Sequence, residues 1–331
     1  MKVVIGFDSS AASDYIFTDL LAAGFPEDTE FMIVSSTDME GISDEVDTGL
    51  TNLSGTPPGS TWHGEISTSE RNYLIAMLEN ANSLARQRTT ELNEETHKAA
   101  LRLRELFPAA AVSYHVESVN PYSAIMSRAN EMDADVIVVG SQNASSLSKL
   151  FLGSVSQGVV THAERTVRIA RAQANPDPAS LKVIVAYDGS DDSQHMVDAV
   201  ARRQWPKDTM IRVVTVAEAK SLGVLLGRLI GLKKESGETV SEASAQQPQE
   251  ALRDLAEAAA KKLEAPGITV EATAAYGDPK QLLTQMAEEW QADTIFLGAQ
   301  GHQKLKGKSL GAVANALTGR ARCSVEVVRK A

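Results

Sequence analysis

Short apolar runs rich in valine and isoleucine recur along the chain and alternate with segments of helical periodicity. Phe31–Val34 and Val136–Val139 are two such runs. Within each half of the chain the predicted order is strand, helix, strand, helix, strand, helix, strand, loop, helix, strand. This alternation predicts a parallel sheet covered by helices on both faces.

The chain also repeats itself. VVIGFDSSAAS, from Val3 to Ser13, reads like VIVAYDGSDDS, from Val183 to Ser193, so that Asp8 corresponds to Asp188 at an offset of 180. Later segments match at an offset of 158, as Gly140 does with Gly298. The first half therefore carries 22 extra residues, which fall between its second and third strands. A repeat of this length indicates duplicated domains rather than a solenoid.

We expect an α/β fold made of two tandem doubly wound domains related by pseudo-twofold symmetry, each Rossmann-like with an open parallel five-stranded sheet. The predicted boundaries are 1–172 and 181–331, with a proline-containing linker at 173–180. In the first half we expect a long helix from about Ser69 to Leu106. In the second half Leu222–Leu232 carries glycines every four residues, which favours either a lid on its own domain or a docking surface.

Composition narrows the possible partners. The 331 residues include 43 acidic and 32 basic side chains, which argues against non-specific nucleic-acid binding. The single cysteine, Cys323, excludes an internal disulfide and fits a reducing compartment, so that a cytoplasmic location is expected. We expect neither a secretory leader nor a membrane span, because no apolar run approaches about 20 residues.

A glycine-rich loop follows the apolar run Thr294–Leu297, in the stretch GAQGHQKLKGKSLGAVAN from Gly298 to Asn315. A strand that ends in glycine and leads through a basic loop to a helix can surround a phosphate with backbone amides. The lysines of this loop either neutralise that phosphate or only keep the loop soluble; they are Lys304, Lys306 and Lys308. In open α/β sheets this loop and the first-strand aspartate meet at the carboxyl ends of the strands.

With these features the chain resembles a tandem universal stress protein. ATP-binding members of that family show G-x2-G-x9-G followed by serine or threonine after the fourth strand. The second half has all three glycines, with Ala312 at the hydroxyl position, whereas the first half keeps the hydroxyl with Ser154 and has Asn143 at the middle glycine. Asparagine is tolerated there if the backbone needs a positive φ, but obstructs the site if the backbone must approach phosphate closely.

The resemblance implies that Asp188 and Val216 frame an adenine base and that the glycine loop holds ribose and phosphates. The residues implied in the second half, which we favour, are Asp188, Val216, Gly298, Gly301, Gly311, Ala312, Val313 and Ala314. Their counterparts in the first half are Asp8, Ser36, Gly140, Asn143, Gly153, Ser154 and Ser156. The implied ligand is ATP or a related adenine nucleotide, with or without Mg²⁺. Asp8 and Asp188 have a compatible structural interpretation as residues that cap the following helix.

No catalytic constellation accompanies this motif. The six histidines show no metal-ligand spacing, and neither a nucleophile elbow nor a P-loop is present. We therefore expect a nucleotide-binding switch that acts on an unknown protein partner. Two alternatives remain, which are an interaction module without nucleotide and an adenylating enzyme.

Family members commonly pair through their last strands, and the two copies in this chain could do so with each other. Antiparallel pairing would set Arg168 opposite Glu326, which is favourable for opposite charges. The segments expected to pair are Val167, Arg168 and Ile169 with Val325, Glu326 and Val327.

Overall fold

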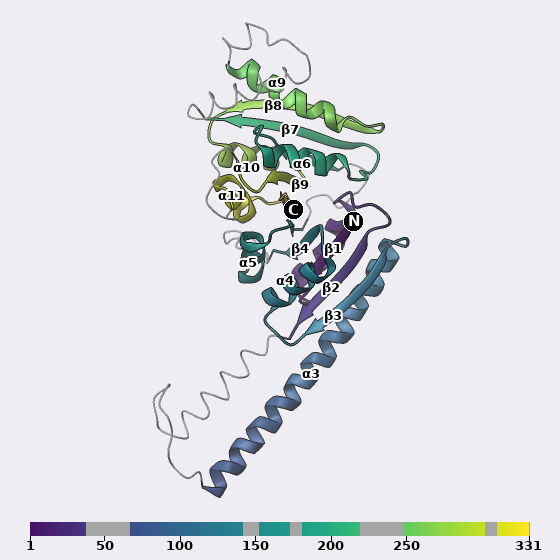
Figure 1. Ribbon diagram of the computed structural model, residues 1–331, viewed down its shortest axis with the longest axis vertical. Helices are drawn as coiled ribbons and strands as arrows, with labels where there is room; N and C mark the ends of the chain where they lie inside the picture. The colour runs from purple at the N-terminus through teal and green to yellow at the C-terminus, as the bar shows by residue number, and fades with distance from the viewer. Residues whose placement is uncertain (38–66, 142–151, 173–180, 219–247, 302–309, 331) are drawn as a thin grey trace.

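The computed structural model describes residues 1–37, 67–141, 152–172, 181–218, 248–301 and 310–330 (Figure 1). The strands of this part are β1 (Lys2–Gly6), β2 (Glu30–Ser36), β3 (Ala111–Glu117), β4 (Val136–Gly140), β5 (Thr166–Ala170), β6 (Lys182–Ala186), β7 (Thr209–Ala217), β8 (Ile268–Tyr276), β9 (Thr294–Gly298) and β10 (Ser324–Val328). The α-helices are α1 (Ala11–Leu21), α3 (Thr68–Leu106), α4 (Pro121–Met132), α5 (Ser154–His162), α6 (Asp191–Ala201), α9 (Pro248–Ala260), α10 (Pro279–Trp290) and α11 (Ala312–Arg320).

The described strands form one sheet in the order β3-β2-β1-β4-β5-β10-β9-β6-β7-β8. Each half is parallel and doubly wound, because the chain starts in the middle of its half-sheet and winds outward in both directions. The halves join where β5 pairs antiparallel with β10, which places Glu326 opposite Arg168 in the register. This is the pairing that the sequence predicted. We call this junction the seam.

The two faces of the sheet are covered differently across the seam. On one face a single apolar core continues from α4 and α5 of the first half to α10 and α11 of the second half, and it includes Val167 and Val325 of the two seam strands. On the other face α1 and α3 cover one core, while α6 and α9 cover another. Because side chains alternate along a strand, Arg168 and Glu326 point to this second face.

Four buried charged side chains meet at the seam on the second face. Arg168 contacts Asp19 of α1 through two nitrogens, at 2.6 and 2.8 Å, and Glu326 at 3.0 Å. Arg203, just after α6, also donates to Glu326. Burial acts to lower the pKa of Arg168, but Asp19 and Glu326 raise it by more, so that the guanidinium stays charged. A buried charge needs such partners, and here each acid and each base has one.

The long helix α3 agrees with the predicted helix from about Ser69 to Leu106. It extends well beyond the sheet (Figure 1). Its C-terminal part packs on β2 and β3, where Leu103 and Ala100 are fully buried. Toward its N-terminus the apolar side chains Tyr73, Ile75 and Leu78 are exposed. Within the described ranges, every helix is too short or too polar to cross a lipid bilayer.

Several predicted segments lie outside the described residues. These are the linker at 173–180, the glycine-containing segment Leu222–Leu232, Asn143, and the loop that carries Lys304, Lys306 and Lys308.

Candidate functional site

A pocket of about 290 Å³ opens at the carboxyl ends of β6, β7 and β9, where the N-terminus of α11 forms part of its wall. The chain reverses its winding direction between β6 and β9, which is the place where open α/β sheets bind ligands. All eight residues predicted for the second half line this pocket: Asp188, Val216, Gly298, Gly301, Gly311, Ala312, Val313 and Ala314. The structure thus brings together residues that are up to 126 positions apart in the sequence.

Asp188 follows β6 and is held by the turn that leads into α6. Its Oδ1 accepts a hydrogen bond from the amide of Ser190 at 3.0 Å, and the Ser190 side chain caps the helix by accepting from the amide of Ser193 at 3.2 Å. Asp188 therefore shapes the turn before the helix, while Ser190 caps the helix itself.

The glycine loop passes directly against the Asp188 carboxylate. A Cβ atom added at Gly301 would lie 2.7 Å from Oδ2 of Asp188, and the φ angle of Gly301 is not positive. A side chain at position 301 would crowd this carboxylate, so the structure favours glycine here for space rather than for an unusual backbone conformation. In the second half this excludes the positive-φ explanation for the middle glycine, and the neighbour that the loop approaches in the structure is a carboxylate rather than a phosphate.

Asp192 at the start of α6 fixes the same loop, a role that the sequence analysis missed. Its Oδ2 accepts from the amide of Gln300 at 3.0 Å, and a Cβ at Gly298 would lie 2.9 Å from the Asp192 carbonyl carbon. The loop is closed further on, where the amide of Gly311 donates to the carbonyl of Ala299 at 2.8 Å. The repeat gave no signal for Asp192, because its counterpart in the first half is Ala12.

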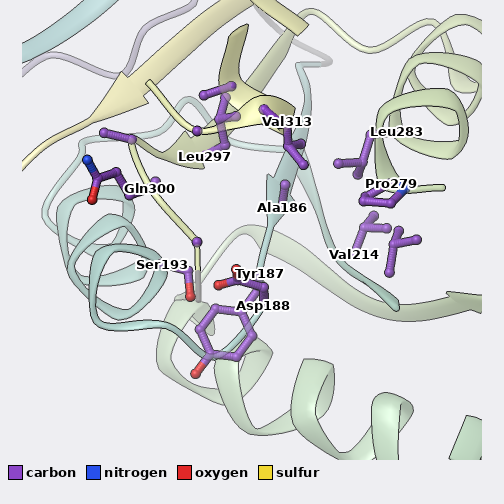
Figure 2. A pocket seen from close by; sticks show the side chains of 17 residues that line it. Ala186, Tyr187, Asp188, Ser193, Val214, Pro279, Leu283, Leu297, Gln300 and Val313 are labelled. Atoms are coloured by element: carbon purple, nitrogen blue, oxygen red, sulfur yellow. The ribbon is translucent and has the colours of Figure 1, made fainter. Parts of the chain in front are cut away.

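The pocket has a polar side and an apolar side (Figure 2). Asp188 and Ser193 lie together on one side, while Val214, Pro279 and Leu283 lie on the other. Sequence reasoning did not assign these three apolar residues to the site. Pro279 and Val214 did carry a signal, since they match Pro121 and Val34 in the repeat. A flat apolar group fits the second side, and a group with hydrogen-bond donors fits the first.

The N-terminus of α11 supplies the remaining chemistry. The first amides of a helix have no acceptor within the helix, and the helix dipole makes this end favourable for an anion. Here those amides belong to Ala312, Val313 and Ala314, all of which line the pocket. The site can thus hold an anionic group at one end and an apolar group at the other.

The first half has a corresponding, smaller pocket of about 150 Å³. The predicted residues that line it are Asp8, Ser36, Gly140, Gly153, Ser154 and Ser156. The seventh, Asn143, lies outside the described residues.

Hydroxyl groups of the first pocket are largely bonded to the protein itself. Ser156 donates to the carbonyl of Gly140 at 2.6 Å, and Ser36 donates to the carbonyl of Val119. Ser13 donates to Oδ1 of Asp8 at 2.5 Å. Burial acts to raise the pKa of Asp8, but hydrogen bonds from Ser10 and Ser13 lower it by more, so that the carboxylate is held ionised.

In the described part of the chain, no three side chains of histidine, cysteine, aspartate or glutamate are grouped so that they could hold a metal ion.

Fold and pockets together define a duplicated doubly wound α/β protein with one ligand-sized pocket at the carboxyl end of each half-sheet. The chain belongs to the universal stress protein family, whose model matches residues 72–171 and 180–329. The first match begins within α3.

Individual relatives agree with this assignment. A universal stress protein of Mycobacterium tuberculosis strain H37Rv is 31% identical over 206 residues, which cover 60% of this chain and 63% of that protein. One of Methanocaldococcus jannaschii is 28% identical over 150 residues, covering 45% of this chain and 82% of that protein. The crystal structure of a universal stress protein from Archaeoglobus fulgidus shares the fold, with a TM-score of 0.57 and 18% identity over 100% of this chain and 98% of that chain.

Proposed function

We propose that this chain binds an adenine nucleotide in the pocket of the second half and acts as a nucleotide-dependent switch in a stress response. One observation carries the proposal. The residues of the glycine motif, Asp188 after β6 and Val216 of β7 surround a single pocket, which has an anion-binding end at the N-terminus of α11 and an apolar end. The two units are proposed to be residues 1–172 and 181–331, in a cytoplasmic protein, since the chain has one cysteine.

In the proposed complex the base lies against Val214, Val216 and Leu283, and the phosphates lie at the first turn of α11. Asp188 accepts a hydrogen bond from the base or from a ribose hydroxyl. ATP is the proposed ligand, and Mg²⁺ is expected to strengthen its binding, because the Asp188 carboxylate adds negative charge to the pocket that receives the phosphates. When bound, the metal supplies positive charge to the phosphates.

The second candidate function is an interaction module that has lost its nucleotide. Two observations favour it. Ala312 takes the place of the family hydroxyl, and the part of α3 that extends from the sheet exposes Tyr73, Ile75, Leu78 and Leu84, as a surface for a protein partner would.

Titration calorimetry of the full chain with ATP and with adenosine, each with and without Mg²⁺, tests the proposal. The decisive variant is Ala312→Glu, which places a carboxylate where the phosphates should lie but is compatible with a helix N-terminus. We expect the parent chain to bind ATP and the variant to bind it at least about tenfold more weakly, because two anions would share one site.

The matched control is Ser154→Glu, the corresponding position in the first half. This variant should bind ATP with unchanged affinity if the second pocket is the site. If the variant no longer binds ATP, the first pocket is the site instead. A parent chain that binds neither ATP nor adenosine would favour the interaction module instead.

A further inference from the structure

Each half of the chain ends its last strand with a buried arginine that reaches into the other half. Arg171 follows β5 and is 2% exposed, and Arg329 follows β10 and is 8% exposed. They correspond to each other at the offset of 158 found in the repeat. The antiparallel seam explains their reach, because the end of each of these strands lies beside the start of the other.

Arg171 binds the C-terminal end of α11, the helix whose N-terminus lines the second pocket. Its guanidinium donates to the carbonyl of Thr318 in the last turn of α11 and, at 3.1 Å, to the carbonyl of Cys323. Its backbone amide donates to the Ser324 hydroxyl at 3.0 Å. Thr318 belongs to the last turn, whose carbonyls lack partners within the helix.

Arg329 makes the equivalent contacts on the first half. Its guanidinium donates at 2.8 Å to the carbonyl of Val160 in the last turn of α5, and its amide donates to the hydroxyl of Thr166. Val160 and Thr166 are the repeat counterparts of Thr318 and Ser324. The same arrangement is thus built twice, once in each direction across the seam.

The position of these cations is favourable for anion binding at the far end of each helix. Both helices have nine residues, or about 13 Å of rise, with the arginine at one end and a pocket at the other. A cation at the C-terminus offsets the negative end of the helix dipole and fixes the last turn. Burial lowers the pKa of Arg171 to about 10, which leaves it charged at neutral pH.

We propose that Arg171 is a positioning residue for the second pocket and Arg329 one for the first, so that the anion-binding helix of each half is held by the other half. This rests on the proposed function for the phosphate end of the pocket. The positioning itself does not depend on which nucleotide binds.

The test compares three full-length variants, Arg171→Met, Arg171→Lys and Arg329→Met, by calorimetry with AMP and with adenosine. Arg171→Met should weaken AMP about tenfold and adenosine less than about twofold, because only the phosphate meets the helix end. Arg171→Lys, which keeps the charge, should recover most of the affinity. Arg329→Met removes the equivalent buried arginine, which contacts α5 rather than α11 and is influenced by the charge of Asp192, so it should weaken AMP by less than about threefold.

Amide hydrogen exchange of the same proteins without ligand gives an independent answer. Arg171→Met should speed exchange in α11 from Asn315 onward, whereas Arg329→Met should do so in α5. Equal weakening of AMP and adenosine, or the same exchange pattern in both variants, would overturn the proposal. If the parent binds neither ligand, the proposed nucleotide function fails, and the exchange pattern alone decides whether the arginines position the helices.

Discussion

The pocket of the first half is lined by hydroxyl groups at places where the second half has alkyl groups. Ser154 and Ser156 stand where the second half has Ala312 and Ala314, and Ser36 stands where it has Val216. The hydroxyl-rich pocket is nevertheless the smaller one, at about 150 against 290 Å³.

The difference teaches that a hydroxyl counts for a ligand only if the protein has not already bonded it. Ser156 donates to Gly140, Ser36 donates to Val119, and Ser13 donates to Asp8. In the second half Ser193 donates to the carbonyl of Ser190 instead of the aspartate. Of the two hydroxyls missing from α11, only the one at position 312 is therefore expected to matter for binding.

The halves also differ at the seam, where the matched positions 168 and 326 carry opposite charges. The strongest way to break that difference is Arg168→Met, which leaves Asp19 and Glu326 buried and without this partner. We expect a loss of about 3 to 5 kcal/mol in the free energy of unfolding, as for other disrupted buried pairs. Urea denaturation of the full chain measures it.

Arg165→Met is the matched control, because Arg165 pairs with Asp133, which is 82% exposed. Its loss should stay below about 1 kcal/mol, since water screens an exposed pair. Equal losses in the two variants would show that the seam charges do not stabilise the halves against each other.

A smaller effect sharpens the comparison of the pockets. Ala312→Ser restores a hydroxyl at the first turn of α11 and should tighten ATP binding about fivefold, the equivalent of about 1 kcal/mol for one hydrogen bond. Calorimetry measures this change. Ala314→Ser is the control, because its hydroxyl should donate to the carbonyl of Gly298, as Ser156 does to Gly140, and leave affinity within about twofold. A gain from Ala314→Ser alone would reverse the assignment of the two positions.

The smallest effect concerns Asp8. Ser13→Ala removes one of the hydrogen bonds that lower its pKa, so the pKa should rise toward the usual 3.8, as followed by NMR titration of the carboxyl carbon. A lowered pKa stabilises the fold above the unfolded value and loses that contribution as pH falls through the folded value. Because Asp8 is only partly withdrawn from water and stays exposed at the surface, the loss at neutral pH should be at most about 0.5 kcal/mol. An Asp8 pKa that stays the same in Ser13→Ala would contradict the assignment of this hydrogen bond.

The order of strands and helices along the chain and the duplication could be predicted from the sequence, because they depend on periodicity and on matching one half with the other. The pairing of Arg168 with Glu326 was predicted from the family resemblance together with that matching. The contributions of Asp19 and Arg203 to the same charge cluster were not predicted. Both arrive from helices or loops packed on the sheet, and their counterparts Ala199 and Ala23 give no hint of charge. A long side chain that reaches across an interface leaves no periodic pattern.

The candidate site shows the same limit. Residues of the glycine motif were predictable from spacing, whereas Asp192 was not, since its function depends on the loop that folds against it. Arg171 and Arg329 matched in the repeat but followed strands at a place where charged residues usually face solvent. Only the antiparallel seam brings them to the helices of the opposite half.

The pairing of Arg168 with Glu326 has a consequence for how such a protein can change over generations. In a dimer of identical subunits the same position would meet itself, and every substitution there would appear on both sides at once. In this chain the two positions are encoded separately and joined at a fixed effective concentration, so the seam forms without regard to protein abundance. Each half can therefore acquire a residue that only its neighbour must accommodate, and the two pockets can diverge without the halves coming apart.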